Sequence, residues 1–559
     1  MTIKTEISSP QKAIDLTTFR LLNLSRRQLC DLECLLNGAF APLNGFLDED
    51  NYNSVCATMR LLDGSLWPMP ITLDVSESFS AQTVLGESIL LTNDENTPLA
   101  LLTVSSNWKP NKHLEAQLVF GTTDKKHPAV SYLQDQAGDY YLGGKVTPLS
   151  PIVHYDFIEH RHTPAQLKQL FQVFGWDKIV AFQTRNPIHR AHYELTLRAA
   201  KAVNAHLLIH PVVGMTKPGD VEQLTRVKCY EQILKKYPNQ SAMLSLLPLA
   251  MRMGGPREAL WHAIIRKNYG ATHFIVGRDH AGPGLDSQGV PFYDPYAAQH
   301  QLLEHASEIG LEIMAFPAIV YVKEKARFLA VNELEPTDTI EDISGTELRR
   351  RLEMRLDIPE WFSFPEVVQA LRAAYPPRHQ QGFTLFFTGL SGAGKSTLAK
   401  AIMARLLETT TRTVTLLDGD ILRKNLSSEL GFSKADRDTH ILRVGYLAAE
   451  ITKHKGVAIC AAIAPYTDVR QRIRERISQG GGFIEIYVST PINTCKQRDI
   501  KGLYKKAEAG LIKGFTGVDD PYQEPLNADV VIDTSVMSLV DSVQAVFLAI
   551  EQMGFILPE

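Results

Sequence analysis

The sequence predicts a multidomain α/β protein. Its 559 residues are too many for one hydrophobic core, so we expect roughly three or four compact units. Apolar runs alternate with amphipathic segments from about Trp176 onward and again after Gly382, a rhythm typical of parallel sheets covered by helices. Two separate segments, residues 183–192 and 389–396, also have the composition of phosphate-binding loops.

The overall composition excludes several classes of protein. Hydrophobic residues make up 44% of the chain and charged residues 21%, as in ordinary globular proteins. The 58 lysines and arginines are balanced by 62 acidic residues, so no global positive field is present to hold nucleic acid. Six cysteines without a CxxC pair, and the lack of an apolar run of bilayer length, favour a cytoplasmic protein with no membrane partner. Its partners should be small molecules.

Local patterns divide the chain into four segments, 1–170, 171–335, 336–378 and 379–559. The first is expected to be rich in strands, because turn signals break its short apolar runs. The second and fourth alternate strands with helices. The third should be a small helical segment and linker, since a capping box opens its helix and Pro- and Gly-containing residues precede the last domain. The expected elements are strands at 67–75, 88–94, 178–182, 273–276, 383–388, 414–417, 457–463, 483–488 and 530–532, and helices near 221–237 and after Ser344.

Residues 389–396 match the phosphate-loop pattern GxxxxGK[ST] in full. An apolar run precedes them and an amphipathic segment follows, which supplies the strand and helix that such a loop needs. Glycines let backbone N–H groups face phosphate oxygens, Lys395 supplies a mobile cation, and the Ser396 hydroxyl is suited to Mg²⁺. After the next strand, Asp420 is the candidate base or metal organiser. The nucleotide-binding candidates are Gly389, Ser391, Gly392, Gly394, Lys395, Ser396 and Thr397.

A second phosphate-binding candidate begins at Gln183. Asn186 is suited to be an N-cap and Pro187 to be the first helical residue, which places His189 and His192 one turn apart at a positive helix end. Imidazoles there can donate to the oxygens of a phosphorus atom under attack. A zinc-binding pair and two unrelated surface histidines are the competing interpretations, because HxxH alone is not specific.

The next predicted strand runs into residues 277–284, so Arg278 and tight-turn glycines lie at the carboxyl end of a strand, where α/β sheets bind ligands. Together with residues 183–192, 251–259 and 343–351, this segment is similar to ATP sulfurylase (sulfate adenylyltransferase). The similarity extends over about residues 21–364. It implies a β-rich, PUA-like N-terminal domain followed by a Rossmann-like nucleotidyltransferase domain.

The same resemblance implies roles for individual residues. Because sulfate is already a dianion at neutral pH, its attack on the α-phosphate needs no general base, and the barrier is the repulsion between two anions. The implied catalytic residues are Thr184, Arg185, Asn186, His189 and His192. The implied ligands are Gln183, Arg185 and Ala281 for sulfate, and Gln183, Asn186, Gly277, Arg278, Asp279 and His280 for ATP.

The C-terminal segment, from about Gly382 onward, resembles adenylylsulfate (APS) kinase, which implies a P-loop kinase domain. The similarity rests on residues 418–420, 431–433, 436–437, 501–507 and 514–517. It implies phosphorylation of a ribose 3′-hydroxyl, a lid at 501–517, arginines on the phosphosulfate and phenylalanines around the adenine. The implied APS-binding residues are Asp420, Arg423, Phe432, Arg437, His440, Ile463, Ala464, Lys501 and Phe515.

Three positions depart from the kinase pattern. Ala464 replaces the serine of a Ser-Pro-Tyr motif, and His440 and Leu442 replace an asparagine and an arginine. The serine hydroxyl is one that can be phosphorylated in some members of the family. Direct transfer between two bound nucleotides depends on positioning and electrostatics rather than on a covalent intermediate, so the alanine need not abolish activity.

The sequence therefore predicts a bifunctional enzyme that uses Mg²⁺ and takes ATP as a substrate of both reactions. The first reaction makes APS and pyrophosphate from ATP and sulfate, and the second makes 3′-phosphoadenylylsulfate (PAPS) and ADP from ATP and APS. The alternative is a sulfurylase, running forward or in reverse, whose kinase-like domain is catalytically weak or silent and senses nucleotides. Because large members of the family commonly assemble, we expect a homo-oligomer.

Overall fold

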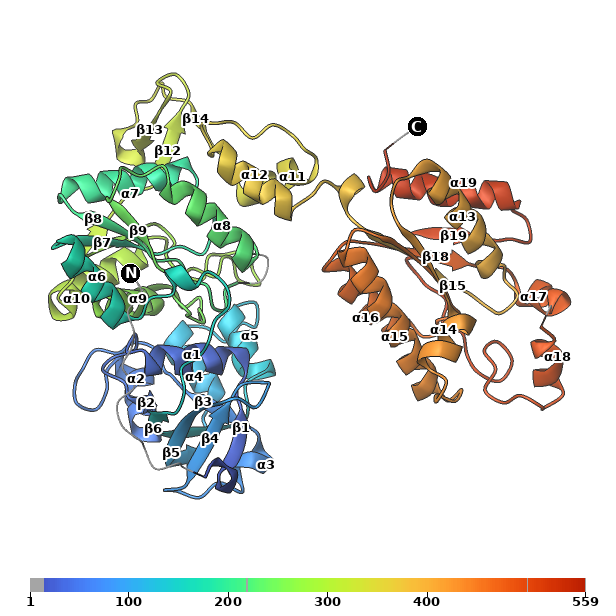
Figure 1. Ribbon diagram of the computed structural model, residues 1–559, viewed down its shortest axis with the longest axis horizontal. Coiled ribbons are helices and arrows are strands. Elements are labelled where there is room, and N and C mark those ends of the chain that lie inside the picture. The colour runs from blue at the N-terminus through green and yellow to red at the C-terminus, as the bar shows by residue number, and fades with distance from the viewer. Residues whose placement is uncertain (1–14, 218–219, 500, 558–559) are drawn as a thin grey trace. The chain divides into compact units, whose positions relative to one another are not determined.

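The computed structural model describes residues 15–217, 220–499 and 501–557. The chain forms two compact units (Figure 1). The first consists of the residues up to Ser344 together with Ile358–Leu371, and the second consists of Gly345–Asp357 together with the residues from Arg372 onward. The chain therefore leaves the first unit, returns to it for a short segment, and ends in the second.

The first part of the first unit is a mixed sheet with helices packed against it. The strand order is β1-β4-β5-β6-β2, and β3 also pairs with β6. Its longest strand alternates exposed and buried side chains over residues 101–105, as a sheet with one covered face requires. The strands are β1 (Arg20–Asn23), β2 (Gly45–Phe46), β3 (Leu73–Val75), β4 (Ser88–Thr92), β5 (Pro98–Trp108) and β6 (Tyr140–Pro148). The helices are α1 (Arg26–Leu36), α2 (Glu49–Thr58), α3 (Glu77–Ser80), α4 (Lys112–Phe120) and α5 (Pro128–Asp135).

A parallel sheet in the order β11-β10-β7-β8-β9 forms the centre of the first unit. All four residues of β7 and all four of β10 are buried, because helices cover both faces of such a sheet. The strands are β7 (Ile179–Phe182), β8 (His206–Ile209), β9 (Ala242–Leu244), β10 (His273–Val276) and β11 (Glu312–Ala315). The helices are α6 (Pro164–Phe174), α7 (Arg190–Ala202), α8 (Gln223–Leu234), α9 (Gly255–Asn268) and α10 (Ala297–Ile309).

A small antiparallel sheet and two helices follow. The strands pair in the order β13-β12-β14. The elements are β12 (Ile319–Val322), β13 (Arg327–Ala330), β14 (Ile340–Glu341), α11 (Gly345–Glu353) and α12 (Pro365–Ala374). Helix α11 begins directly after Ser344, where the capping pattern predicts, but it ends before Leu356.

The second unit contains a parallel sheet in the order β16-β17-β15-β18-β19. One face packs against α13 and α19, and the other packs against α15 and α16. The strands are β15 (Phe383–Thr388), β16 (Val414–Asp418), β17 (Val457–Ala461), β18 (Gly482–Val488) and β19 (Val530–Ile532). The helices are α13 (Lys395–Thr409), α14 (Gly419–Leu426), α15 (Lys434–Lys453), α16 (Thr467–Ser478), α17 (Ile492–Arg498), α18 (Leu503–Glu508) and α19 (Leu539–Gln552).

The predicted elements of the two parallel sheets are confirmed. Strands β10, β15 and β19 have the predicted bounds, and the expected helix near 221–237 is α8. The run at 67–75 forms a strand only in its last three residues. The finer domain limits at 170, 335 and 378 stay a prediction. No helix in the described part of the chain combines the length and hydropathy needed to cross a membrane.

Candidate active sites

The first candidate site lies at the carboxyl edge of the central parallel sheet. Strand β7 lies between β10 and β8. The connection that leaves β7 leads to β8, and the connection that leaves β10 leads to β11, so the two run toward opposite edges of the sheet. Such a switch point is where doubly wound sheets bind ligands. The predicted sulfurylase residues lie in the loop after β7, in the first turn of α7 and in the loop after β10.

Helix α7 begins later than the sequence predicts. Asn186 is not the N-cap and Pro187 is not the first helical residue, because the helix starts at Arg190 with His189 as its N-cap. The Asn186 carbonyl instead accepts hydrogen bonds from Thr184 Oγ1 at 3.0 Å and from the Tyr230 hydroxyl at 2.9 Å. A carbonyl that is held by side chains in this way does not start the helical hydrogen-bond ladder.

His189 and His192 nevertheless lie together at the start of α7, with ring centroids 6.5 Å apart. The backbone N–H of His189 donates to His192 Nδ1 at 3.5 Å, so the proton of a neutral His192 is on Nε2. Burial, and then the neighbouring His192, lower the pKa of His189 to about 3. Burial also lowers the pKa of His192. Both rings are therefore neutral near pH 7 and act as hydrogen-bond donors through one nitrogen each.

Arg185 makes a short ion pair with Asp220, a residue that the sequence reasoning missed. The second carboxylate oxygen of Asp220 accepts from the Lys217 backbone N–H at 3.1 Å. Lys217 Nζ donates to the Pro283 carbonyl at 2.7 Å, which links the loop after β8 to the loop after β10. Burial, and then Arg185, lower the pKa of Lys217. Because no strand is predicted between residues 183 and 220, the sequence pattern carries no signal that places Asp220 at the site.

The loop after β10 divides its side chains between solvent and interior. Arg278 is exposed and contacts Asp279 at 3.4 Å. His280 instead turns inward, with Nε2 3.0 Å from His262 Nδ1, and burial lowers its pKa well below the usual value. Ala281, at a φ of 55°, has the left-handed conformation of a tight turn and is buried.

The second candidate site begins at the glycine-rich loop between β15 and α13. Gly389, Gly392 and Gly394 have φ values of 141°, 76° and 105°, which side-chain-bearing residues rarely adopt. Lys395 Nζ curls back onto the loop and donates to the carbonyls of Gly389 at 2.8 Å and Leu390 at 2.7 Å. Burial lowers the pKa of Lys395 to about 8. The Lys395 ammonium therefore contacts the backbone of its own loop.

Oxygen donors suited to Mg²⁺ meet beside this loop. Ser396 Oγ lies 3.3 Å from Asp418 Oδ2. Asp418 Oδ1 accepts from the backbone N–H groups of Asp420 at 3.0 Å and Ile421 at 3.3 Å, and so caps α14. Hydroxyl and carboxylate oxygens are the hard ligands that Mg²⁺ prefers. The residues present therefore fit the ion that the sequence implies.

Lys501 joins this group from the predicted lid. Its ammonium makes a short ion pair with Asp420 Oδ2, and both side chains are more than half exposed. Arg423 stacks its guanidinium over Phe432, with the central carbon 4.5 Å from the ring centroid. Phe432 is 66% exposed, whereas Phe515 is partly buried. The exposed ring is free to meet a flat ligand.

Arg437 is occupied by the end of the predicted lid. Its Nη1 donates to the Gly514 carbonyl and to Thr516 Oγ1, each at 3.1 Å. Its Nη2 donates to the Tyr466 hydroxyl at 2.9 Å and lies 2.8 Å from Asp520 Oδ1. Arg437 therefore fastens the lid to α15, and its role toward the phosphosulfate stays a prediction.

His440 is buried beside α14. Its Nδ1 lies 3.0 Å from Ser427 Oγ, and burial, followed by the charge of Arg423, lowers its pKa to about 4. Ala464 is buried and has a φ of 44°. Its carbonyl accepts from Thr388 Oγ1 at 3.2 Å, and the Ile463 carbonyl accepts from the same hydroxyl at 2.7 Å. His440, Ile463 and Ala464 thus contact other protein groups, and their roles toward APS stay a prediction.

A separate surface group contains potential metal ligands. One atom each from Glu159, His160 and Glu231 lie within 4.8 Å of one another. His160 Nε2 is 3.7 Å from Glu159 and 3.5 Å from Glu231, which are separations of ion pairs. None of the three was predicted as a site residue.

Three family models match successive parts of the chain. The ATP-sulfurylase family model matches residues 159–374, the adenylylsulphate kinase model matches residues 381–533, and the PUA-like domain model matches residues 4–151. The predicted fold class is thereby confirmed for all three parts.

Relatives match this chain over nearly their whole length. The sulfate adenylyltransferase of Phaeosphaeria nodorum is 51% identical over 95% of this chain and 93% of its own length. That of Yarrowia lipolytica is 50% identical over 96% of this chain and 94% of its own length. The structure titled hexameric APS kinase from Thiobacillus denitrificans has a TM-score of 0.78 and 38% identity, and the match covers 97% of this chain and 94% of that one. With both catalytic domains present along nearly its whole length, this transferase belongs to the sulfate adenylyltransferase family.

Proposed function

We propose that the chain catalyses two consecutive steps of sulfate activation. The first unit converts ATP and sulfate into APS and pyrophosphate, and the second converts ATP and APS into PAPS and ADP. The observation that carries the proposal is that each unit presents its own phosphate-binding loop at the carboxyl edge of its own parallel sheet.

In the first reaction, a sulfate oxygen attacks the α-phosphorus and pyrophosphate leaves. Arg185 releases the carboxylate of Asp220 and binds the sulfate in its place. His192 donates from Nε2 to an α-phosphate oxygen, because its Nδ1 already accepts the His189 N–H. The start of α7 adds the positive end of a helix dipole. These groups lower the repulsion between the two anions and align the displacement.

In the second reaction, the ribose 3′-hydroxyl of APS attacks the γ-phosphorus of ATP. Asp420 accepts the hydroxyl proton, and Lys395 leaves the Gly389 and Leu390 carbonyls to contact the transferred phosphate. Ser396 and Asp418 would hold Mg²⁺, which neutralises phosphate charge when it is bound. Positioning and electrostatics account for this transfer, so no covalent intermediate on residue 464 is needed.

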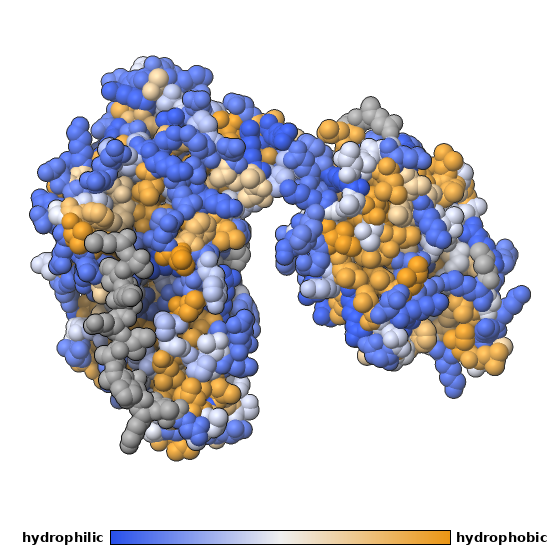
Figure 2. Space-filling view, in the orientation of Figure 1, coloured by the Kyte–Doolittle hydropathy of each residue, from blue (hydrophilic) through white to orange (hydrophobic). Residues whose placement is uncertain are grey.

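The oligomeric state and the cellular compartment are part of the same proposal. The neighbour from Thiobacillus denitrificans is titled hexameric, and Figure 2 shows hydrophobic residues gathered on the second unit. Leu526, Val531 and Val536 are exposed around the edge strand β19, and such apolar surface is typical of interfaces. We therefore propose a homo-oligomer. The six cysteines are all free, which supports a reducing compartment such as the cytoplasm.

Sulfate-dependent exchange of pyrophosphate into ATP tests the first activity. We expect exchange in the wild type and a loss of at least about a hundredfold in Arg185→Ala and His192→Ala, because each removes a donor to transition-state charge. Arg198→Ala and His113→Ala are the matched controls, since both lie outside the site. Exchange that persists in both site variants would overturn the assignment, and rates in both directions would give the preferred direction.

ADP release from ATP and APS, followed on purified protein, tests the second activity. We expect turnover that Lys395→Ala abolishes, because Lys395, Ser396 and Asp420 are all in place. If the protein binds APS without releasing ADP, the second unit is a nucleotide sensor, and the kinase proposal is wrong.

A further inference from the structure

Residues 361–364, here called the clamp, pack against the start of α7 although they follow it by most of the central domain. The Phe362 carbonyl accepts from the Arg190 backbone N–H at 3.1 Å, where the helix has a free donor. The Phe362 ring lies 4.6 Å from the His189 ring. The clamp therefore contacts both the backbone and the side chain of the helix start.

The outer residues of the clamp anchor it on two sides. The Trp361 ring stacks on Tyr321 of β12, with centroids 4.9 Å apart and planes 10° apart. The Phe364 ring lies 4.2 Å from the central guanidinium carbon of Arg190 and 5.3 Å from the ring of Tyr193. Aromatic and cation–π contacts of this kind fix side chains in one geometry. The inner residues are consequently held in place rather than free to adapt.

Ser363 is the polar residue of the clamp. It is 1% exposed, and its Oγ lies 2.9 Å from His189 Nδ1. Within the described residues, this is its only side-chain hydrogen bond, and His189 Nε2 has none. Of the two ring nitrogens, Nε2 is thus the one left for a ligand.

A neutral imidazole carries one N–H proton, and its tautomer follows from what the other nitrogen does. If Ser363 donates to Nδ1, the proton stays on Nε2, which can then donate to a phosphate oxygen. A hydrogen bond of the same kind fixes the tautomer of His192, whose Nδ1 accepts the His189 backbone N–H. With Ser363 as the donor, both rings have the same tautomer, one fixed by a backbone donor and the other by the clamp.

We propose that Ser363 is a positioning residue for adenylyl transfer, which holds His189 in the Nε2–H tautomer and in a fixed ring orientation. This inference rests on the proposed sulfurylase function. Ser363 does not itself contact the substrates and acts through His189.

The kinetic test compares Ser363→Ala with Ser363→Thr in pyrophosphate exchange by the full chain. We expect the alanine variant to lose about tenfold in kcat, the value of one hydrogen bond, with unchanged KM for ATP and sulfate. Threonine keeps the hydroxyl and should restore most of the rate. The matched control is Ser80→Ala, which removes a buried serine bonded to Asn107 at 2.7 Å and should leave the rate unchanged.

A spectroscopic test does not depend on turnover. In ¹⁵N-histidine-labelled protein, with the His189 signals assigned through His189→Gln, we expect the Nε2–H tautomer in the wild type and a mixture in Ser363→Ala. An unchanged tautomer in Ser363→Ala, or an unchanged kcat in that folded variant, overturns the inference. Absence of exchange in the wild type would instead overturn the proposed function, while the tautomer measurement would still decide the role of Ser363.

Discussion

Arg185, Lys395 and Asp420, the charged residues with the most direct predicted roles, each contact a protein group in place of a substrate. Arg185 pairs with Asp220, Lys395 donates to its own loop, and Asp420 pairs with Lys501. Arg185 and Lys395 are largely removed from water and need such partners, because leaving a desolvated charge unpaired is costly. The pair of Asp420 with Lys501 is exposed. Substrate binding is therefore an exchange of partners, and the internal partner sets part of the affinity.

Asp220→Asn should strengthen sulfate binding. The carboxylate competes with sulfate for Arg185, and an amide competes less. The ion pair is only partly buried, so we expect a decrease in sulfate KM of about two- to fivefold, equivalent to roughly 0.5–1 kcal/mol. Exchange kinetics measure this, and Asp139→Asn, which breaks the pair with Lys112 at 3.0 Å, is the control. An increased sulfate KM would mean that Asp220 builds the site rather than competing for it.

His210 should make the stability of the first unit depend on pH. It is fully buried, and no ring nitrogen has a partner in the described structure. Burial, followed by the charge of Arg266, lowers its pKa well below the usual value. An unfolded histidine takes up a proton near pH 6.5, whereas the folded one stays neutral. The free energy of unfolding contributed by this site therefore falls as the pH drops below about 6.5.

Replacement of His210 by phenylalanine isolates this effect from other titrating groups. The ring contact with Tyr269, at 4.5 Å between centroids, can be kept in His210→Phe. Between pH 7.5 and 5.5 we expect the variant to lose less stability than the wild type, with a slope difference that approaches one proton. Denaturant unfolding followed by tryptophan fluorescence reports on this unit, because all five tryptophans lie in it. Parallel slopes would contradict a neutral His210.

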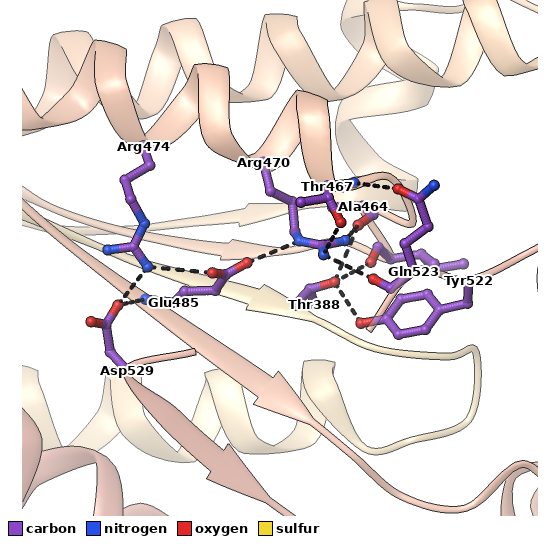
Figure 3. A network of polar contacts seen from close by, with 10 residues as sticks. Thr388, Ala464, Thr467, Arg470, Arg474, Glu485, Tyr522, Gln523 and Asp529 are labelled. Carbon is purple, nitrogen blue, oxygen red and sulfur yellow. Dashed lines mark hydrogen bonds and ion pairs between the residues drawn. The ribbon is translucent and has the colours of Figure 1, made fainter. Parts of the chain in front are cut away.

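At the scale of elements, Arg470 of α16 connects three parts of the kinase fold (Figure 3). It donates to the Ala464 carbonyl and to the Gln523 carbonyl, both at 2.8 Å, and pairs with Glu485 of β18 at 3.0 Å. Ala464 has a left-handed conformation that is unfavourable for an alanine. The contact from Arg470 holds this carbonyl where the loop after β17 meets the phosphate-loop strand.

Arg470→Ala should destabilise the second unit by about 3–5 kcal/mol, because it leaves the buried Glu485 without its nearest cation. Arg474→Ala is a matched control, since this more exposed residue also contacts Glu485, at 3.3 Å, and should cost less than about 1 kcal/mol. Hydrogen exchange of the β15 and β18 amides measures the loss. Tryptophan fluorescence of the first unit should not change. If the two variants destabilise the second unit equally, burial of the arginine does not determine the free energy that is lost.

The elements that the sequence predicted well are those with a strong local signal. Strands β10, β15 and β19 are mainly apolar runs between turn-forming residues, and the glycine pattern at 389–396 specifies its own loop. The start of α7 was predicted wrongly, because the Thr184 and Tyr230 contacts to Asn186 come from the loop and from another helix. Asp220 and Ser363 could not be assigned to the site, since only the folded chain brings them to Arg185 and His189.

At the scale of the whole molecule, the two candidate sites lie in two compact units that share one chain. The first reaction is uphill, because the phosphosulfate anhydride is a high-energy product, and the second consumes that product. The chain therefore places the producing site and the consuming site in one molecule at equal stoichiometry. This arrangement does not by itself require direct transfer of APS from one site to the other.

A mixture of two variants, each of which lacks one of the two activities, tests how APS travels between the sites. Arg185→Ala should make no APS but keep its kinase, and Lys395→Ala should make APS but no PAPS. When the two are mixed with ATP, sulfate and pyrophosphatase, we expect PAPS formation after a lag, because APS that diffuses through solution reaches an intact kinase site. The lag should shorten as the concentration of Arg185→Ala is raised. If each variant alone keeps its remaining activity but the mixture forms no PAPS, APS does not reach the kinase site through solution. APS must then pass from one site to the other within one molecule.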